Sequence, residues 1–118
     1  MEMPVWQNAH HLALEVFQIT VTLPRSEDYG LTSQIRRSSN SVPANLAEGF
    51  GRNTRKDKAN FYSIARGSVF ETQSHLIYGQ KIGYFSPETT QHLIEEYSNL
   101  CHEINKILKS LSSPQPQP

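Results

Sequence analysis

Residues 87–111, PETTQHLIEEYSNLCHEINKILKSL, decide the fold class of this 118-residue chain. Apolar side chains recur in this stretch every three or four residues, which is the spacing of one face of an α-helix. The same spacing recurs near the amino terminus. The two seams are Leu93, Tyr97, Leu100, Ile104, Ile107 and Leu111, and Val5, Ala9, Leu12, Val16, Ile19 and Leu23. Both predict helices that pack along a shared core.

Turn and capping residues divide the chain between these two seams. Thr54 followed by Asp57 is a capping-box variant that begins a helix, and Ser86 before Pro87 is an N-cap before a first-turn proline. Pro24 predicts the end of the first helix at Leu23. The predicted helices cover residues 5–23, 31–50, 54–82 and 87–112.

Four helices with short connections predict an all-α protein, an antiparallel up-down-up-down four-helix bundle over residues 1–112. Residues 113–118 are predicted to be a disordered tail of proline and glutamine. The predicted helices are too long for a helix-turn-helix DNA reader, which uses short helices around a tight turn.

The two middle helices depart from a simple apolar seam. In residues 31–50, three of the six seam positions are small or polar, namely Ser38, Asn45 and Gly49. The third helix carries a second stripe that one bundle cannot bury, which predicts a subunit contact. That stripe is Phe61, Ile64, Ser68, Glu71, His75, Tyr78 and Ile82. The polar residues Asn45, Glu48, Ser68 and Glu71 are predicted to be structural, with Asn45 and Glu71 partly buried and hydrogen-bonded.

Positive charge gathers in the middle of a chain whose net charge is zero. Residues 36–66 hold seven basic and two acidic side chains, so this stretch is +5 and the remainder is −5. Such an asymmetry suggests a face or end built for an anionic partner, and the alternative is a solvated surface with uneven charge. Arg52, Arg55, Lys56 and Lys58 cluster at a glycine turn and at the positive end of the third helix, where a phosphate could bind. An ordinary helix-ending turn is the alternative.

Two further arginines, Arg36 and Arg37, lie about 24 Å from that cluster at ~1.5 Å per helical residue. They are predicted to contact nucleic acid in an assembly that aligns several copies of the chain. The alternative is that the arginines form salt bridges between subunits. RNA or DNA and a protein are both candidate partners.

Sequence patterns for catalysis and metal binding are missing. The chain has no Glu-x-x-His pair, no histidine spacing typical of a metal site and no Gly-Lys-Ser/Thr phosphate loop. The single cysteine, Cys101, falls beside the last helical seam and is predicted to be a small buried residue. We expect no enzymatic activity, no metal and no cofactor. With no apolar run of about 20 residues and no leader pattern, we expect a cytoplasmic protein without membrane contact.

Four stretches of the chain together resemble a bacterial family, the proteins encoded in intervening sequences of 23S rRNA genes, also described as ribosomal-protein-like. They are residues 5–7 (VWQ), 29–37 (YGLTSQIRR), 41–52 (SVPANLAEGFGR) and 64–71 (IARGSVFE). The resemblance covers residues 5 to about 111. The positions that match its motifs are Arg36, Arg37, Asn45, Glu48, Gly49, Arg52, Ser68 and Glu71.

The resemblance implies a four-helix bundle that assembles into a homopentameric ring. A relative of similar fold is the accessory variability protein of diversity-generating retroelements, which binds nucleic acid and a reverse transcriptase through a basic surface. The implied function is therefore that of a nucleic-acid-binding or ribonucleoprotein accessory protein. A ring-shaped scaffold for protein–protein interaction, without nucleic-acid binding, is the alternative.

Overall fold

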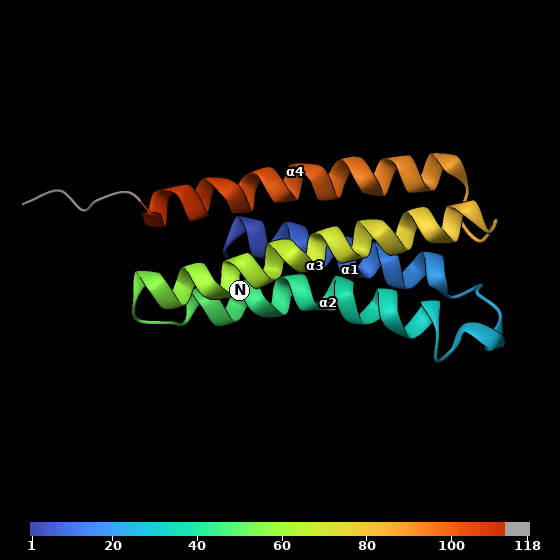
Figure 1. The fold of residues 1–118 in the computed structure, drawn as a ribbon, viewed down its shortest axis with the longest axis horizontal. Coiled ribbons are helices and arrows are strands. Elements are labelled where there is room, and N and C mark those ends of the chain that lie inside the picture. The colour runs from blue at the N-terminus through green and yellow to red at the C-terminus, as the bar shows by residue number, and fades with distance from the viewer. Residues whose placement is uncertain (113–118) are drawn as a thin grey trace, which may run out of the picture.

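The computed structural model describes residues 1–112, which form four long helices (Figure 1). They are α1 (Pro4–Thr20), α2 (Leu31–Phe50), α3 (Arg55–Lys81) and α4 (Pro87–Ser112), with a short 3-10 helix, η1 (Arg25–Glu27), before α2. Successive helices run in opposite directions (Figure 1), and the described residues contain no strand. The predicted all-α up-down-up-down bundle is confirmed. The predicted tail of residues 113–118 lies outside the described residues.

The helix starts follow the predicted caps. The backbone N–H of Asp57 donates to the Thr54 hydroxyl at 3.1 Å, and that of Thr89 donates to the Ser86 hydroxyl at 3.1 Å. Each side chain thereby satisfies one of the N–H groups that the first turn of a helix leaves unpaired. Sequence and structure therefore agree on where α3 and α4 begin.

The predicted end of the first helix, at Leu23, is wrong by three residues, because α1 ends at Thr20. The Thr20 hydroxyl donates to the carbonyl oxygens of Val16 and Phe17, at 3.0 and 2.9 Å. The next turn is tighter, with the N–H of Leu23 bonded to the Thr20 carbonyl at 3.1 Å. Pro24 disfavours helical dihedrals at Leu23, so the helix must end before that residue.

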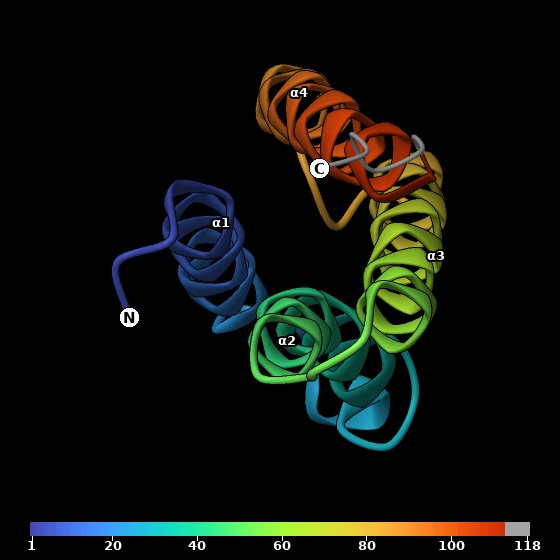
Figure 2. The same ribbon diagram turned by 90° about the vertical axis from the view of Figure 1, so that its left-hand side faces the viewer.

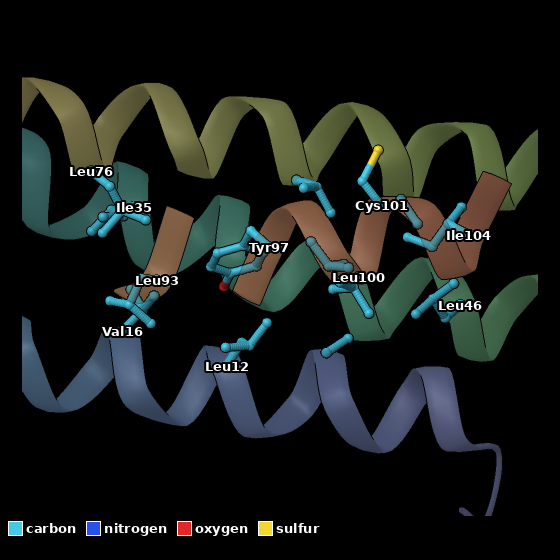
Figure 3. Packing of buried hydrophobic residues seen from close by; sticks show 14 of the residues in the cluster. Leu12, Val16, Ile35, Leu46, Leu76, Leu93, Tyr97, Leu100, Cys101 and Ile104 are labelled. Atoms are coloured by element: carbon cyan, nitrogen blue, oxygen red, sulfur yellow. The ribbon is translucent and has the colours of Figure 1, made fainter. Parts of the chain in front are cut away.

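The core runs along the bundle and takes side chains from all four helices (Figure 3). Cys101 is buried within it, as predicted from its place beside the α4 seam. Tyr97 is fully buried, and burial raises the pKa of its hydroxyl. The labelled core residues are Leu12, Val16, Ile35, Leu46, Leu76, Leu93, Tyr97, Leu100, Cys101 and Ile104.

Helices α2 and α3 pack side by side in the middle of the molecule, with α1 beside α2 and α4 beside α3 (Figure 2). Small residues permit this approach. A Cβ atom on Gly49 would lie 2.6 Å from Cε1 of Tyr62, a ring that is itself buried. Gly49 is therefore a position of the α2 seam where a side chain would prevent the close approach of α3.

The second stripe of α3 divides into two parts. Ser68 is buried and Glu71 is half-buried beside α2, whereas Ile64, Tyr78 and Ile82 remain exposed. A second group of exposed apolar side chains lies along α1 and directly after its last residue, formed by Leu14, Phe17 and Val21. One copy of the chain thus leaves an apolar strip uncovered on α1 and another on α3, the second interrupted by Ser68, Glu71 and His75.

Candidate nucleic-acid interface

The four basic residues Arg52, Arg55, Lys56 and Lys58, called the basic turn below, lie where α2 passes into α3. Thr54 caps α3 directly at this turn. Lys58 reaches back across it, and its Nζ donates to the carbonyl oxygens of Gly49 at 3.3 Å and Phe50 at 2.8 Å. These carbonyls belong to the last turn of α2, whose oxygens have no partner within the helix. Lys58 therefore closes the carboxyl end of α2.

Arg55 donates in a similar way to the last carbonyl oxygens of α4. Its Nε donates to the carbonyl oxygen of Leu111 at 3.0 Å, and its Nη2 donates to that of Ser110 at 2.6 Å. A positive charge against the carboxyl end of a helix is favourable, since that end carries partial negative charge. Arg55 thus joins the start of α3 to the end of α4.

The other two members of the basic turn face solvent. Arg52 forms an ion pair with Glu48 at 3.3 Å, and its guanidinium lies 4.5 Å from the centre of the Phe61 ring. Lys56 is exposed and bonds to no side chain or carbonyl within residues 1–112. These two side chains can reach an external anion without breaking a helix cap.

A hollow of about 630 Å³ lies beside the basic turn. Its wall carries charges of both signs, because the carboxylates of Glu48 and Asp57 stand near Arg52. A carboxylate repels a phosphate and accepts hydrogen bonds from N–H groups. The hollow is lined by Ala44, Ala47, Glu48, Gly51, Arg52, Asn53, Thr54 and Asp57.

The fold adds two basic residues to this end of the molecule that sequence reasoning missed. Lys106 and Lys109 lie in the last two turns of α4, which the contacts of Arg55 bring next to the start of α3. The predicted antiparallel topology could have indicated their position, because it places the end of α4 beside the α2–α3 turn. The amino-acid distribution alone had assigned both lysines to the acidic remainder of the chain.

Arg36 and Arg37 lie away from the basic turn, as their sequence separation predicts. The Nε of Arg36 donates to the Thr20 hydroxyl at 2.9 Å, and its guanidinium lies 4.1 Å from the centre of the Phe17 ring. Arg37 forms an ion pair with Glu71 across the α2–α3 contact. Glu71 also accepts from Nε2 of His75 at 3.2 Å. Both arginines are therefore engaged within the chain.

The predicted structural polar residues meet between α2 and α3. The amide of Asn45 donates to the backbone carbonyl of Ser41 at 2.8 Å and to its hydroxyl at 3.0 Å. Ser68 donates to the same hydroxyl at 2.9 Å. Asn45 and Glu71 are half-buried and hydrogen-bonded, as predicted, whereas Glu48 is exposed and pairs only with Arg52 among the described residues.

Histidines and carboxylates do not gather into a metal site within residues 1–112. Pairs do form across the α1–α4 seam, where Nε2 of His92 lies 3.3 Å from the Glu15 carboxylate. Across the same described range, no helix combines the length and the apolar character that a bilayer crossing requires.

These features define a small four-helix bundle with a basic end and a polar contact between its middle helices. Residues 1–109 match the family model of the 23S rRNA-intervening sequence protein. The chain belongs to this family, and the resemblance seen in its motifs is confirmed.

The fold is shared with a protein of unknown function from the S23 ribosomal protein family of Bacteroides thetaiotaomicron VPI-5482, known from a crystal structure. The two have a TM-score of 0.80 and 21% sequence identity, over 89% of this chain and 98% of the other. No curated protein matches the chain. Neither the family nor the similar structure indicates an enzyme.

Proposed function

We propose that this chain is a non-enzymatic accessory protein of the cytoplasm that binds nucleic acid, or a ribonucleoprotein, through its basic end. The observation that carries the proposal is the gathering of six basic side chains from three segments at one end of the bundle. Acidic side chains are also present at this end, among them Glu48 and Asp57 beside the basic turn. The basic residues are Arg52, Arg55, Lys56, Lys58, Lys106 and Lys109.

Phosphate contacts explain how such a surface would act. Each phosphate that is neutralised releases counterions, so affinity falls steeply with salt and depends little on base sequence. Arg55 and Lys58 retain their positive charge while they close helix ends, so they contribute to the local field. Arg52 and Lys56 are the side chains that contact the phosphate directly in this proposal.

The proposed active form is a homopentamer. The two apolar strips on α1 and α3, left exposed by one copy, support self-association, since soluble monomers rarely leave such surfaces uncovered. A ring also repeats the basic end and Arg36 and Arg37 five times, which raises affinity through avidity. Light scattering coupled to gel filtration is expected to give about 67 kDa, five times the 13.4 kDa of one chain. A monomer at tens of micromolar would contradict it.

Fluorescence anisotropy with a labelled RNA hairpin and a DNA duplex, at about 50 and 200 mM salt, tests nucleic-acid binding. The variant should be Arg52→Gln combined with Lys56→Gln, because replacing Arg55 or Lys58 would also remove a helix cap. We expect binding that weakens with salt and is lost in the double variant. Absence of binding at the lower salt would contradict the proposal.

A protein–protein scaffold is the second candidate, favoured by the exposed apolar strips and by the engagement of Arg36 and Arg37 within the chain. In this case the ring recruits another protein and no nucleic acid. Purification from the native cell with and without RNase separates the two. A partner retained after RNase, in a protein that shows no binding in the anisotropy assay, would favour the scaffold.

A further inference from the structure

Aromatic rings lie under the basic side chains of this protein. The Arg52 guanidinium covers Phe61, and Lys58 Nζ lies 5.7 Å from the centre of the Phe50 ring. Both pairs belong to the α2–α3 turn. Phe50 remains 59% exposed, although a large apolar side chain is normally buried. The turn therefore presents flat, partly apolar surfaces to solvent beside its charges.

Three of the four basic side chains of this turn already have partners within the chain. Arg55 and Lys58 direct their donors at backbone carbonyls. Arg52 is paired with Glu48, whose carboxylate also lines the neighbouring hollow. Ligands that match this surface combine a flat ring, N–H groups that can donate to a carboxylate, and one nearby negative charge.

We propose that the α2–α3 turn binds unpaired nucleotides, with a base stacked on the Phe50 ring or on the Arg52 guanidinium and the adjoining phosphate at Lys56. The inference rests on the proposed nucleic-acid binding and names single strands as its substrate. Bases of a duplex stack on one another, whereas an unpaired base offers its ring face to an aromatic or guanidinium plane. Arg52, Glu48 and Asp57 line the hollow beside the turn, so a base stacked on the Arg52 guanidinium would lie near carboxylates that accept hydrogen bonds from base N–H groups.

Charge-preserving variants separate stacking from phosphate binding. Phe50→Leu removes the aromatic ring, and Arg52→Lys keeps the positive charge but loses the guanidinium plane. Phe70→Leu is the matched control, because Phe70 is another exposed phenylalanine of the bundle and lies one residue before Glu71, far along α3 from the turn. Thermal melts of each variant check that the bundle remains folded.

The assay measures fluorescence anisotropy with a labelled 12-nucleotide single strand, as RNA and as DNA, and with the matching duplexes at about 50 mM salt. We expect the wild type to bind single strands about tenfold more tightly than duplexes. Phe50→Leu and Arg52→Lys should each weaken single-strand binding about fivefold or more and weaken duplex binding by less, whereas the Phe70→Leu control should bind both probes as the wild type does. Equal affinity for single strands and duplexes, or binding that neither variant alters, would overturn this inference and leave the proposed function standing. Absence of binding to every probe would overturn both.

Discussion

Thr72 donates a hydrogen bond to the hydroxyl of Ser38 at 2.9 Å, in a fully buried position between α3 and α2. The Thr72 hydroxyl also lies 2.8 Å from the carbonyl oxygen of Ser68, and Ser38 donates to the carbonyl of Ile35 at 3.2 Å. Two polar side chains are thus satisfied inside a contact that holds the middle of the bundle together.

The first prediction concerns this pair. Thr72→Val keeps the shape of the side chain but removes its hydroxyl, and we expect it to lower the free energy of unfolding by about 1 kcal/mol. Ser38→Ala should cost a similar amount. Because the two residues touch, the double variant should depart from additivity by at least ~0.5 kcal/mol. Urea denaturation of the four proteins measures this coupling, and strict additivity would show that the hydrogen bond contributes nothing.

The second prediction compares two glycines within helices. Gly49→Ala places a Cβ against the buried Tyr62 ring, so we expect a loss of about 1 to 3 kcal/mol in unfolding free energy. Gly67→Ala meets no atom within 4 Å and is exposed on α3. It should instead stabilise by roughly 0.5 to 1 kcal/mol, because alanine is the better helix former. Denaturant titration measures the change in unfolding free energy of both variants. We expect the change to be a loss for Gly49→Ala and a gain for Gly67→Ala.

The third prediction concerns Glu71, which pairs with Arg37 and His75. Its side chain is 39% exposed and that of Arg37 is 54% exposed, so solvent screens the ion pair. We expect Glu71→Ala to cost no more than about 1 kcal/mol and to lower the melting temperature by roughly 2 to 5 °C. Glu96→Ala, at an exposed site on α4, is the control and should leave melting unchanged. An unchanged melting temperature in Glu71→Ala would mean that the carboxylate is not structural.

The fourth prediction follows from the buried hydroxyl of Tyr97, which finds no hydrogen-bond partner among residues 1–112. Burial raises its pKa in the folded state, whereas the pKa of a tyrosine in the unfolded chain is about 10. The neutral hydroxyl is therefore compatible with folding below about pH 10, and stability should fall as the pH rises above that value.

Tyr97→Phe should remove this part of the alkaline loss and stabilise the bundle by up to about 1 kcal/mol at neutral pH. Thermal melts from pH 8 to 11 provide the measurement. Tyr29→Phe is the control, since Tyr29 is 97% exposed and its ionisation should not affect folding. A Tyr97→Phe variant as alkali-sensitive as the wild type would contradict the prediction.

Local sequence signals were sufficient for the helices. The predicted bounds of α2 match the structure, and Thr54 and Ser86 cap α3 and α4 as expected. Such signals work because a cap or an apolar spacing acts within one or two helical turns. The predicted end of α1 was wrong because Leu23 was counted as the last helical residue. Pro24 disfavours helical dihedrals at Leu23, and α1 ends at Thr20.

The amino-acid sequence by itself determined the fold class, the helical seams and the separation of charge along the chain. Only the tertiary structure decided how the basic residues are used. Lys58 and Arg55 close the ends of α2 and α4, and Lys109 joins them at the same end of the bundle. Arg55 and Leu111 are far apart in the sequence, and their contact exists because antiparallel packing brings the end of α4 beside the start of α3. Residue type sets the charge of a side chain, whereas its available donors depend on which carbonyls and rings the packed helices place around it.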